Sequence, residues 1–260
     1  MFHFELRPLE QIQPWGDPEN PKLHWFGLTD GQYWIQAGGS KLFEYSSAAQ
    51  ARFGAQRFCA YQVVRLYEDV IELAPYALEP VPEELRGYIA LDESKPWEHY
   101  WKRWCEATDP SDESEEAMDL LDNAGPWISC RTLDSAYLTP SINIVFWSDQ
   151  ESVHIEWDNR EKLLEGSPAW TAQVGSWQVP RAKFMDEIRS FHARLMEQMA
   201  ERVSQVVAGA LSARIRVDLD SLRHEQQIRS QSIERNLGLP ASPTDWSLVM
   251  EAIRSLEARR

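Results

Sequence analysis

Long apolar runs and a basic leader segment are absent from this sequence. No run of about 18 apolar residues occurs, which is the length that a membrane-spanning helix needs. Residues 1–8, MFHFELRP, lack a basic segment followed by an apolar one, so we expect no signal peptide. The chain has only three cysteines, Cys59, Cys105 and Cys130, without the close spacing of a metal site. They indicate free thiols in a reducing cytoplasm.

Positive charge is scarce. The 260 residues include 26 Lys and Arg against 41 Asp and Glu, a formal net charge of −15. Residues 1–180 carry 13 basic and 30 acidic residues, whereas residues 181–260 carry 13 and 11. An acidic surface repels nucleic acids and anionic lipids and attracts basic partners, although solubility alone is also a common reason for such a charge. We therefore expect a protein partner, and neither a nucleic acid nor a membrane.

Common nucleotide-binding and hydrolase motifs are missing as well. Gly38-Gly39 is not followed by the lysine and helix of a phosphate-binding loop, and no GxGxxG or GxSxG motif occurs. His99 and Cys105 are six residues apart, which places them on different sides of a helix. The sequence therefore predicts no catalytic residues, no cofactor and no metal.

One long amphipathic segment organises the rest of the chain. After Pro180, apolar residues recur at spacings of three and four, which predicts a helix over residues 181–208: Phe184, Ile188, Phe191, Leu195, Met199, Val203 and Val206. Alternating apolar residues predict strands at 2–6, 142–147 and 153–158, with a turn at 149–152. A further strand is expected at 170–179.

Shorter signals predict the remaining elements. Asp30-Gly31 is typical of a hairpin turn between two aromatic strands within residues 23–35, and Gly38-Gly39 of a second turn. Residues 53–74 fit either a helix or a strand, which Pro75 should end. A helix from Asp109 through Leu121 should stop near Gly125-Pro126, and a strand should follow at 127–133.

Two helices are expected at the C-terminal end. Asp218 predicts the start of one that continues through Asn236. The last helix should begin near Ser242, with an acid at the capping position, Asp245. Its buried stripe would consist of Trp246, Val249, Met250, Ile253 and Leu256.

Together these elements predict an α+β fold. We expect an antiparallel sheet of about six to eight strands, built from the N-terminal meander and the central hairpin and covered by the long helix and the C-terminal helices. The length suits a single domain over residues 1–260. A possible division separates an acidic part, 1–135, from a hairpin-and-helix part, 136–260.

Two N-terminal stretches resemble a known family. FHFELRPLEQIQPWG at 2–16 and LHWFGLTDGQYWI at 23–35 are similar to an uncharacterised family of bacterial proteins, a domain of unknown function. Phe191-His192 in the long helix and Thr244-Asp245-Trp246 near the end are similar to it as well. The resemblance spans nearly the whole chain and implies a bacterial protein. It implies no activity and no catalytic residues.

An aromatic helix is expected just before the acidic one. Ser94 predicts its start, and one side carries Trp97, Tyr100, Trp101 and Trp104. Aromatic stripes at this spacing usually pack in a core, which is the interpretation we favour, but Trp and Tyr also anchor protein interfaces.

The segment between Arg103 and Arg131 contains acids and no basic residue. The eight acids are Glu106, Asp109, Asp112, Glu113, Glu115, Glu116, Asp119 and Asp122. Such carboxylates repel one another, and either a basic partner or water and salt relieves the repulsion. The candidate partner-binding residues are therefore Trp97, Trp101, Trp104, Asp112, Glu113, Glu115, Glu116 and Asp119.

Histidines and acids on one strand form the only other candidate site. His154, Glu156 and Asp158 share a strand face and could ligate a metal. We favour a solvated polar face instead, because Val153, Ile155 and Trp157 fill the other face. His24 and His192 lie among aromatic residues and are expected to be hydrogen-bonded structural histidines.

These observations favour a binding protein over an enzyme. The hypothesis is a cytoplasmic bacterial protein that binds another protein, most specifically an immunity protein that neutralises a cognate basic toxin. The alternative is an enzyme of unknown reaction with a small-molecule pocket among the aromatic hairpins, using His154, Glu156 or His24. A scaffolding protein without any toxin is a third possibility.

Overall fold

The computed structural model describes residues 1–91, 115–231, 233, 237 and 242–258, except the side chains of residues 115–118, 256 and 258. The chain folds into two compact units whose segments alternate along the sequence. Unit 1 comprises residues 1–72, 160–173 and 182–238, and unit 2 comprises residues 73–159, 174–181 and 239–260. Helices and antiparallel sheets occur together, so the predicted α+β class is confirmed. The expectation of a single domain stays a prediction.

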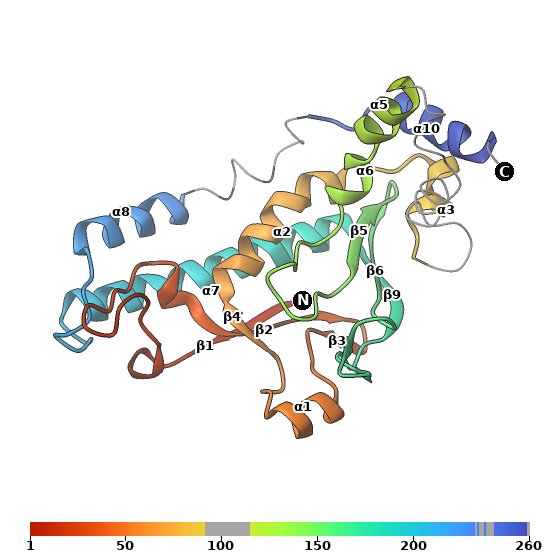
Figure 1. Ribbon diagram of the computed structural model, residues 1–260. Coiled ribbons are helices and arrows are strands. Elements are labelled where there is room, and N and C mark those ends of the chain that lie inside the picture. The colour runs from red at the N-terminus through yellow and green to blue at the C-terminus, as the bar shows by residue number, and fades with distance from the viewer. Residues whose placement is uncertain (92–114, 232, 234–236, 238–241, 259–260) are drawn as a thin grey trace. The chain divides into compact units, whose positions relative to one another are not determined.

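Unit 1 is built on a four-stranded antiparallel sheet (Figure 1). β1 (Phe2–Leu6) pairs along one edge of β2 (Asp30–Ala37). The other edge of β2 pairs with β4 (Cys59–Gln62) near its start and with β3 (Ser40–Leu42) near its end. Phe2 and Phe4 are buried, as their alternation with His3 and Glu5 predicts. The Gly38-Gly39 turn joins β2 to β3 as expected.

The predicted hairpin turn at Asp30-Gly31 is wrong. Residues 27–29 form a short 3-10 helix, η2 (Gly27–Thr29), and β2 begins at Asp30. Gly31 is instead a paired strand residue, opposite Leu6 in β1 and Tyr61 in β4. A Cβ atom at Gly31 would lie 2.4 Å from the carbonyl oxygen of Glu5. The glycine is therefore required by the close approach of β1, not by a turn.

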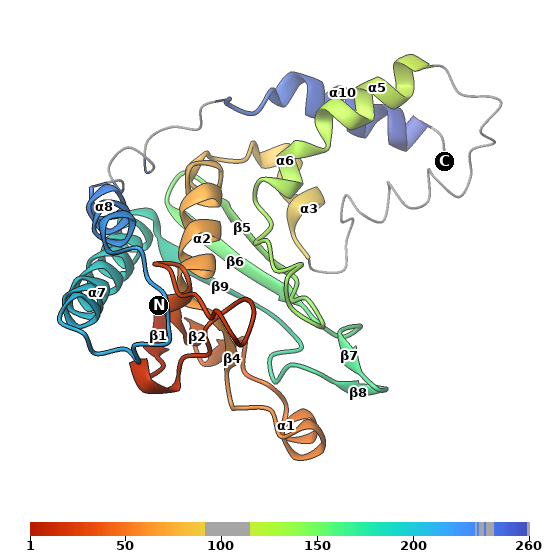
Figure 2. The same cartoon turned by 60° about the vertical axis from the view of Figure 1, so that its left-hand side comes forward.

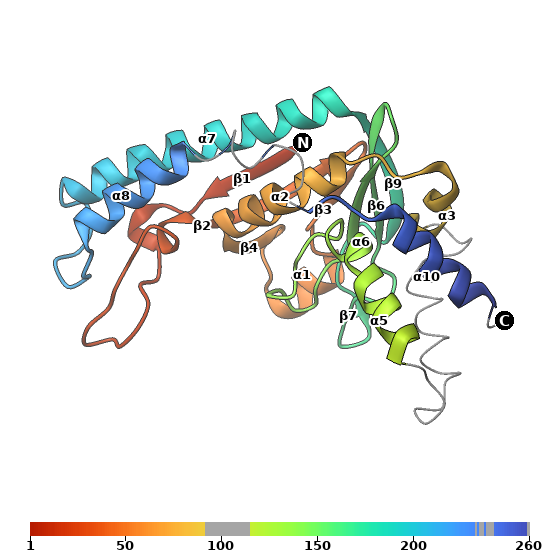
Figure 3. The same ribbon diagram turned by 90° about the horizontal axis from the view of Figure 1, so that it is seen from above.

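The long helix α7 (Arg181–Val207) covers one face of this sheet, as predicted (Figure 3). Its apolar stripe is buried throughout. The Phe2 ring of β1 stacks on Phe191 at 5.5 Å and meets Phe184 edge-on at 6.3 Å. The Arg194 guanidinium donates to the carbonyl oxygen of Phe2 at 2.7 Å, so a polar contact supports the apolar packing.

Residues 59–78 contain both of the elements that the sequence left open. β4 is followed directly by α2 (Val63–Leu78), which begins in unit 1 and ends in unit 2. The expected stop at Pro75 is wrong, because Pro75 lies inside α2. Proline lacks an amide hydrogen and cannot donate to the preceding turn, yet the helix continues to Leu78 on its remaining bonds.

Smaller elements complete unit 1. They are η1 (Leu9–Gln11), α1 (Ser47–Phe53), and the two-stranded ribbon β7 (Leu163–Leu164) and β8 (Ser167–Pro168). α8 (Leu219–Ser230) is capped by Asp218, whose carboxylate accepts the amide hydrogens of Asp220 and Ser221. α8 ends at Ser230, earlier than the Asn236 predicted, and residues 234–236 lie outside the described part of the chain.

Unit 2 contains a three-stranded antiparallel sheet in the order β5-β6-β9 (Figure 2). The strands are β5 (Ile144–Ser148), β6 (Ser152–Asp158) and β9 (Val174–Pro180). The predicted hairpin with its turn at 149–152 is confirmed. Within the described residues the strands of the two units belong to different sheets, so the expectation of one large sheet is wrong. β5 is buried on both faces, which alternation alone did not indicate.

Short helices pack around the sheet of unit 2. η3 (Glu83–Leu85) leads into α3 (Arg86–Ile89), and α5 (Glu115–Ala124) is followed by α6 (Pro126–Ser129). The strand predicted at 127–133 is wrong, because its first residues form α6 and only Thr132 bridges to Val145 of β5. α10 (Trp246–Ala258) begins where Asp245 accepts the amide hydrogens of Ser247 and Leu248.

None of the helices in the described residues is both long enough and apolar enough to cross a membrane.

Candidate partner-binding site

Three of the eight candidate partner-binding residues lie in the described part of the chain. Trp97, Trp101, Trp104, Asp112 and Glu113 lie outside the described residues. Glu115 and Glu116 form the start of α5, and Asp119 is exposed on the same helix. That these residues bind a partner stays a prediction.

α5 lies against α10, and this contact decides which of its faces reaches solvent. Leu121 and Ala124 are buried in one cluster with Val249, Ala252 and Ile253 of α10. Figure 1 and Figure 3 both show the two helices side by side. Asp119 and Asp122 are exposed. The helix is therefore amphipathic, with carboxylates on the side that does not pack.

The negative charge of the chain belongs almost entirely to unit 2. Residues 73–159, 174–181 and 239–260 contain 22 Asp and Glu residues and 9 Lys and Arg residues, a net charge of −13. Unit 1 contains 19 and 17, a net charge of −2. Acidic residues of unit 2 therefore outnumber its Lys and Arg residues by 13, and the electrostatic field of this unit is strongly negative.

A small cavity lies at the C-terminal end of α5. Its volume is about 100 Å³. Its lining comes from α2, α5, α6 and α10 and from residues next to α6 and α10: Tyr76, Asn123, Ala124, Pro126, Trp127, Cys130, Thr244, Asp245, Leu248 and Val249. No motif in the sequence predicts this cavity. The one available signal was the expected cap at Asp245, which marks the start of α10 but not the residues that α10 faces.

A buried ion pair stands next to this cavity. Arg131 is fully buried and donates to the Glu79 carboxylate at 2.6 Å and to the carbonyl oxygen of Trp127 at 2.7 Å. Glu79 also accepts from the amide and the hydroxyl of Thr244. Burial lowers the pKa of the Arg131 guanidinium, and the Glu79 carboxylate opposes this shift. The pair therefore ties α2 and the segment before α10 to the turn after α6.

The strand face with His154 and Glu156 is not the solvated face that we favoured. Glu156 is 6% exposed and accepts the indole hydrogen of Trp147 at 2.8 Å and the amide hydrogen of Leu91 at 2.7 Å. The His154 ring stacks on Trp147 at 3.9 Å and bonds Asp149 at 3.0 Å. The face is covered because Trp147 on β5 lies beside both side chains. No group of three or more potential metal ligands occurs within the described residues.

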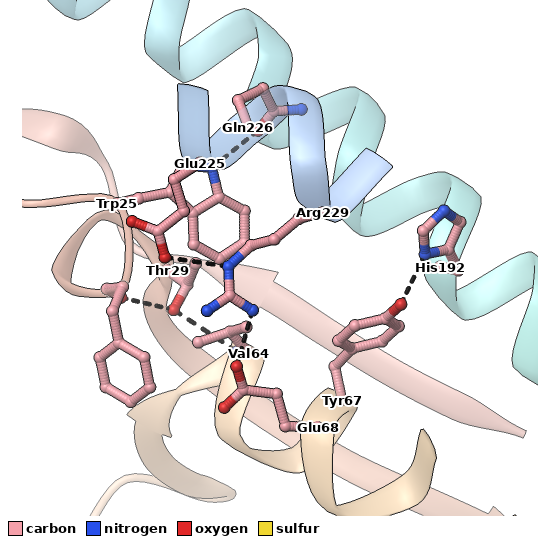
Figure 4. Close-up of polar contacts among 10 residues, drawn as sticks. Trp25, Thr29, Val64, Tyr67, Glu68, His192, Glu225, Gln226 and Arg229 are labelled. Atoms are coloured by element: carbon pink, nitrogen blue, oxygen red, sulfur yellow. Dashed lines mark hydrogen bonds and ion pairs between the residues drawn. The ribbon is translucent and has the colours of Figure 1, made fainter. Parts of the chain in front are cut away.

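His192 is hydrogen-bonded within unit 1, as expected. Its Nδ1 lies 2.7 Å from the Tyr67 hydroxyl of α2, and its Nε2 lies 3.3 Å from the carbonyl oxygen of Ser230 in α8 (Figure 4). A carbonyl oxygen only accepts, so Nε2 carries a proton in this arrangement. His24, in contrast, is exposed, and its ring meets Trp15 edge-on at 4.6 Å.

Further polar contacts fasten α8 to the rest of unit 1. Arg229 pairs with Glu225 at 3.0 Å and with Glu68 of α2 at 2.6 Å, and its guanidinium lies 4.5 Å from the Trp25 ring (Figure 4). The Trp25 indole donates to Gln226 at 2.8 Å. Each charged group of this network has a partner within it, which is typical of a structural role.

The chain was compared with protein families, curated proteins and solved structures. A family described as "Family of unknown function (DUF5984)" matches residues 1–252. No match was found among the curated proteins or the solved structures. The expected resemblance to an uncharacterised family is thereby confirmed, while the bacterial origin stays a prediction. The chain belongs to DUF5984, a family of unknown function.

Proposed function

We propose that this chain is a cytoplasmic protein-binding protein of bacterial origin whose unit 2 binds a basic protein. Its most specific form is an immunity protein that neutralises a cognate basic toxin. The observation that carries the proposal is the division of charge, with a net charge of −13 in unit 2 against −2 in unit 1.

Solubility alone would not require this division. A charge that only keeps a protein soluble can be spread over the whole surface, whereas a charge gathered on one unit repels itself and costs folding free energy. A basic partner relieves that repulsion on binding. It also approaches faster, because complementary charge steers the encounter.

α5 supports the proposal locally. Its apolar side packs on α10, which leaves Asp119 and Asp122 exposed for an approaching partner. Trp97, Trp101 and Trp104 stay proposed as anchors that hold the formed complex, since buried aromatic side chains often dominate interface energies. The acids would then act mainly on association and the tryptophans mainly on dissociation.

Gene context and a growth assay test this proposal. We expect a gene directly upstream that encodes a basic protein, whose expression alone stops growth of a bacterial host. Co-expression of this chain should restore growth. A variant with Asp112, Glu113, Glu115 and Glu116 changed to Lys, produced at the same level as the native chain, should protect poorly.

Two results would contradict the proposal. One is a neighbouring gene set that encodes a metabolic pathway and no growth inhibitor. The other is equal protection by the charge-reversed chain, which would show that the acidic segment does not contribute to binding.

A further inference from the structure

The cavity at the end of α5 combines an apolar wall with a polar rim. Trp127, Leu248 and Val249 contribute apolar surface, whereas Asn123, Thr244 and Asp245 contribute amide, hydroxyl and carboxylate groups. All of its lining residues belong to unit 2. This combination suits a ligand that is apolar along its length and polar at one end.

The size of the cavity limits that ligand. A volume of about 100 Å³ is smaller than the cavity of about 150 Å³ that accommodates benzene, so it suits a single slender chain. Lys and Arg side chains have this shape, because they bury an apolar stem while the charged end stays among polar groups.

Charge around the cavity favours a cation. Asp245 uses one carboxylate oxygen, Oδ1, to cap α10, accepting from the amides of Ser247 and Leu248 at 3.1 Å each. Its second oxygen takes no part in the cap. Asp119 and Asp122 are exposed on α5, whose C-terminal end lines the cavity and adds the negative end of the helix dipole.

Two positive groups near the cavity oppose the binding of a cation, and a carboxylate balances each of them. The buried Arg131 guanidinium donates to Thr244 at 3.2 Å, but the Glu79 carboxylate, 2.6 Å away, balances its charge. The amino-terminal end of α10 carries partial positive charge, which the Asp245 carboxylate meets directly. The remaining formal charge at the cavity is therefore negative.

We propose that this cavity receives one Lys or Arg side chain of the basic partner, with the stem against Trp127 and Leu248 and the cationic end at Asp245. The proposal rests on the proposed function for the identity of the partner. The charge preference can be tested without the partner: in the unbound chain, the cavity should prefer a slender cation to a slender anion of the same size.

Cys130 allows this preference to be measured directly. The thiol lines the cavity and is half-buried. Two methanethiosulfonate reagents of similar size, aminoethyl with a positive charge and sulfonatoethyl with a negative charge, each form a mixed disulfide with a thiolate and release methanesulfinate. Their rates at Cys130 are followed by mass spectrometry of its peptide, and each rate is divided by the rate of the same reagent with free 2-mercaptoethanol. The ratio of these normalised rates is independent of the thiolate fraction.

At low ionic strength we expect the normalised ratio to favour the cation by about tenfold, and to fall towards one as salt is added. Asp245→Asn should reduce the ratio several-fold while keeping the cap, since Asn is also a good N-cap residue. The matched control is Asp218→Asn, which removes the same charge from the cap of α8 in unit 1 and should leave the ratio unchanged.

A ratio at or below one in the native chain would overturn the proposal. So would a ratio that Asp245→Asn does not change, or that Asp218→Asn lowers equally. If Asp245→Asn disturbs folding, Asp122→Asn on the exposed side of α5 replaces it, with a smaller expected decrease.

Failure here is distinguishable from failure of the proposed function. A cation-selective cavity in a chain that protects against no upstream toxin would leave the cavity assigned and reject the immunity role. A non-selective cavity in a chain that does protect would reject the cavity as the anchor and keep the immunity role.

Discussion

Arg131 is fully buried, and the Glu79 carboxylate, 2.6 Å away, balances its charge. Glu79 lies beyond the end of α2, 52 positions earlier in the chain. Because a charged group is costly to bury alone, the free energy of this pair depends on both partners being present. The ion pair therefore joins distant segments of unit 2.

Replacing Glu79 by Gln should destabilise the protein by about 3–5 kcal/mol, because the Arg131 charge is then buried without a counter-ion. The measurement is chemical denaturation of the full chain, followed by tryptophan fluorescence. Glu83→Gln is the matched control, since Glu83 is exposed on η3, and it should change the free energy of unfolding by no more than about 0.5 kcal/mol. Equal effects of the two substitutions would show that the buried pair is not important for stability.

Gly31→Ala should weaken the sheet of unit 1. The new methyl group would sit 2.4 Å from the carbonyl oxygen of Glu5, so β1 would have to move away from β2, at a cost of about 1–3 kcal/mol. Gly39→Ala provides the control, because a Cβ at Gly39 meets no atom within 4 Å. Gly31→Ala should lower the melting temperature and Gly39→Ala should not. A decrease of similar size in both variants would show that the close approach of β1 at Gly31 is not the cause.

Acid stability should depend on Asp149. Burial raises the pKa of its carboxyl group, but the hydrogen bonds from His154 and from the amides of Ser152 and Glu151 outweigh this and lower the pKa to about 2. A carboxylate with a lowered pKa in the folded state contributes stability that is present above its ordinary pKa of 3.8 and is lost as the pH falls towards 2. Asp149→Asn should therefore flatten the decrease in stability between pH 4 and pH 2.

The control for this titration is Asp122→Asn, which removes a carboxyl group from the exposed side of α5. It should leave the acid limb of the stability curve steeper than that of Asp149→Asn. Overlapping curves for the two variants would mean that Asp149 does not contribute to acid unfolding.

Elements with a long periodic pattern could be predicted from the sequence. The seven apolar residues of α7 and the alternation in β5 and β6 are local signals, and the helix and the hairpin that they predict are confirmed. Gly31 and Pro75 misled because one dipeptide or one proline is a weak signal. A glycine that admits a neighbouring strand looks the same in sequence as a glycine in a turn, and only the position of Glu5 separates them.

The candidate site was less predictable for the same reason. The sequence located the acids of α5, but the cavity is formed by four segments that lie as far apart as Tyr76 and Val249. The burial of Glu156 likewise depends on Leu91, 65 positions away.

We propose that the acids of unit 2 attract a basic partner to this chain. The most direct test is the association rate of the chain with its toxin, measured over a range of salt concentrations. Changing Asp112, Glu113, Glu115 and Glu116 to Lys should slow association and flatten its dependence on salt, since exposed charges are screened over about 8 Å at physiological ionic strength. The control changes four exposed acids of unit 1 to Lys, Asp186, Glu197, Glu201 and Asp220, and it should have a much smaller effect. Association that is unchanged by the first set at every salt concentration, or slowed equally by both sets, would contradict the claim.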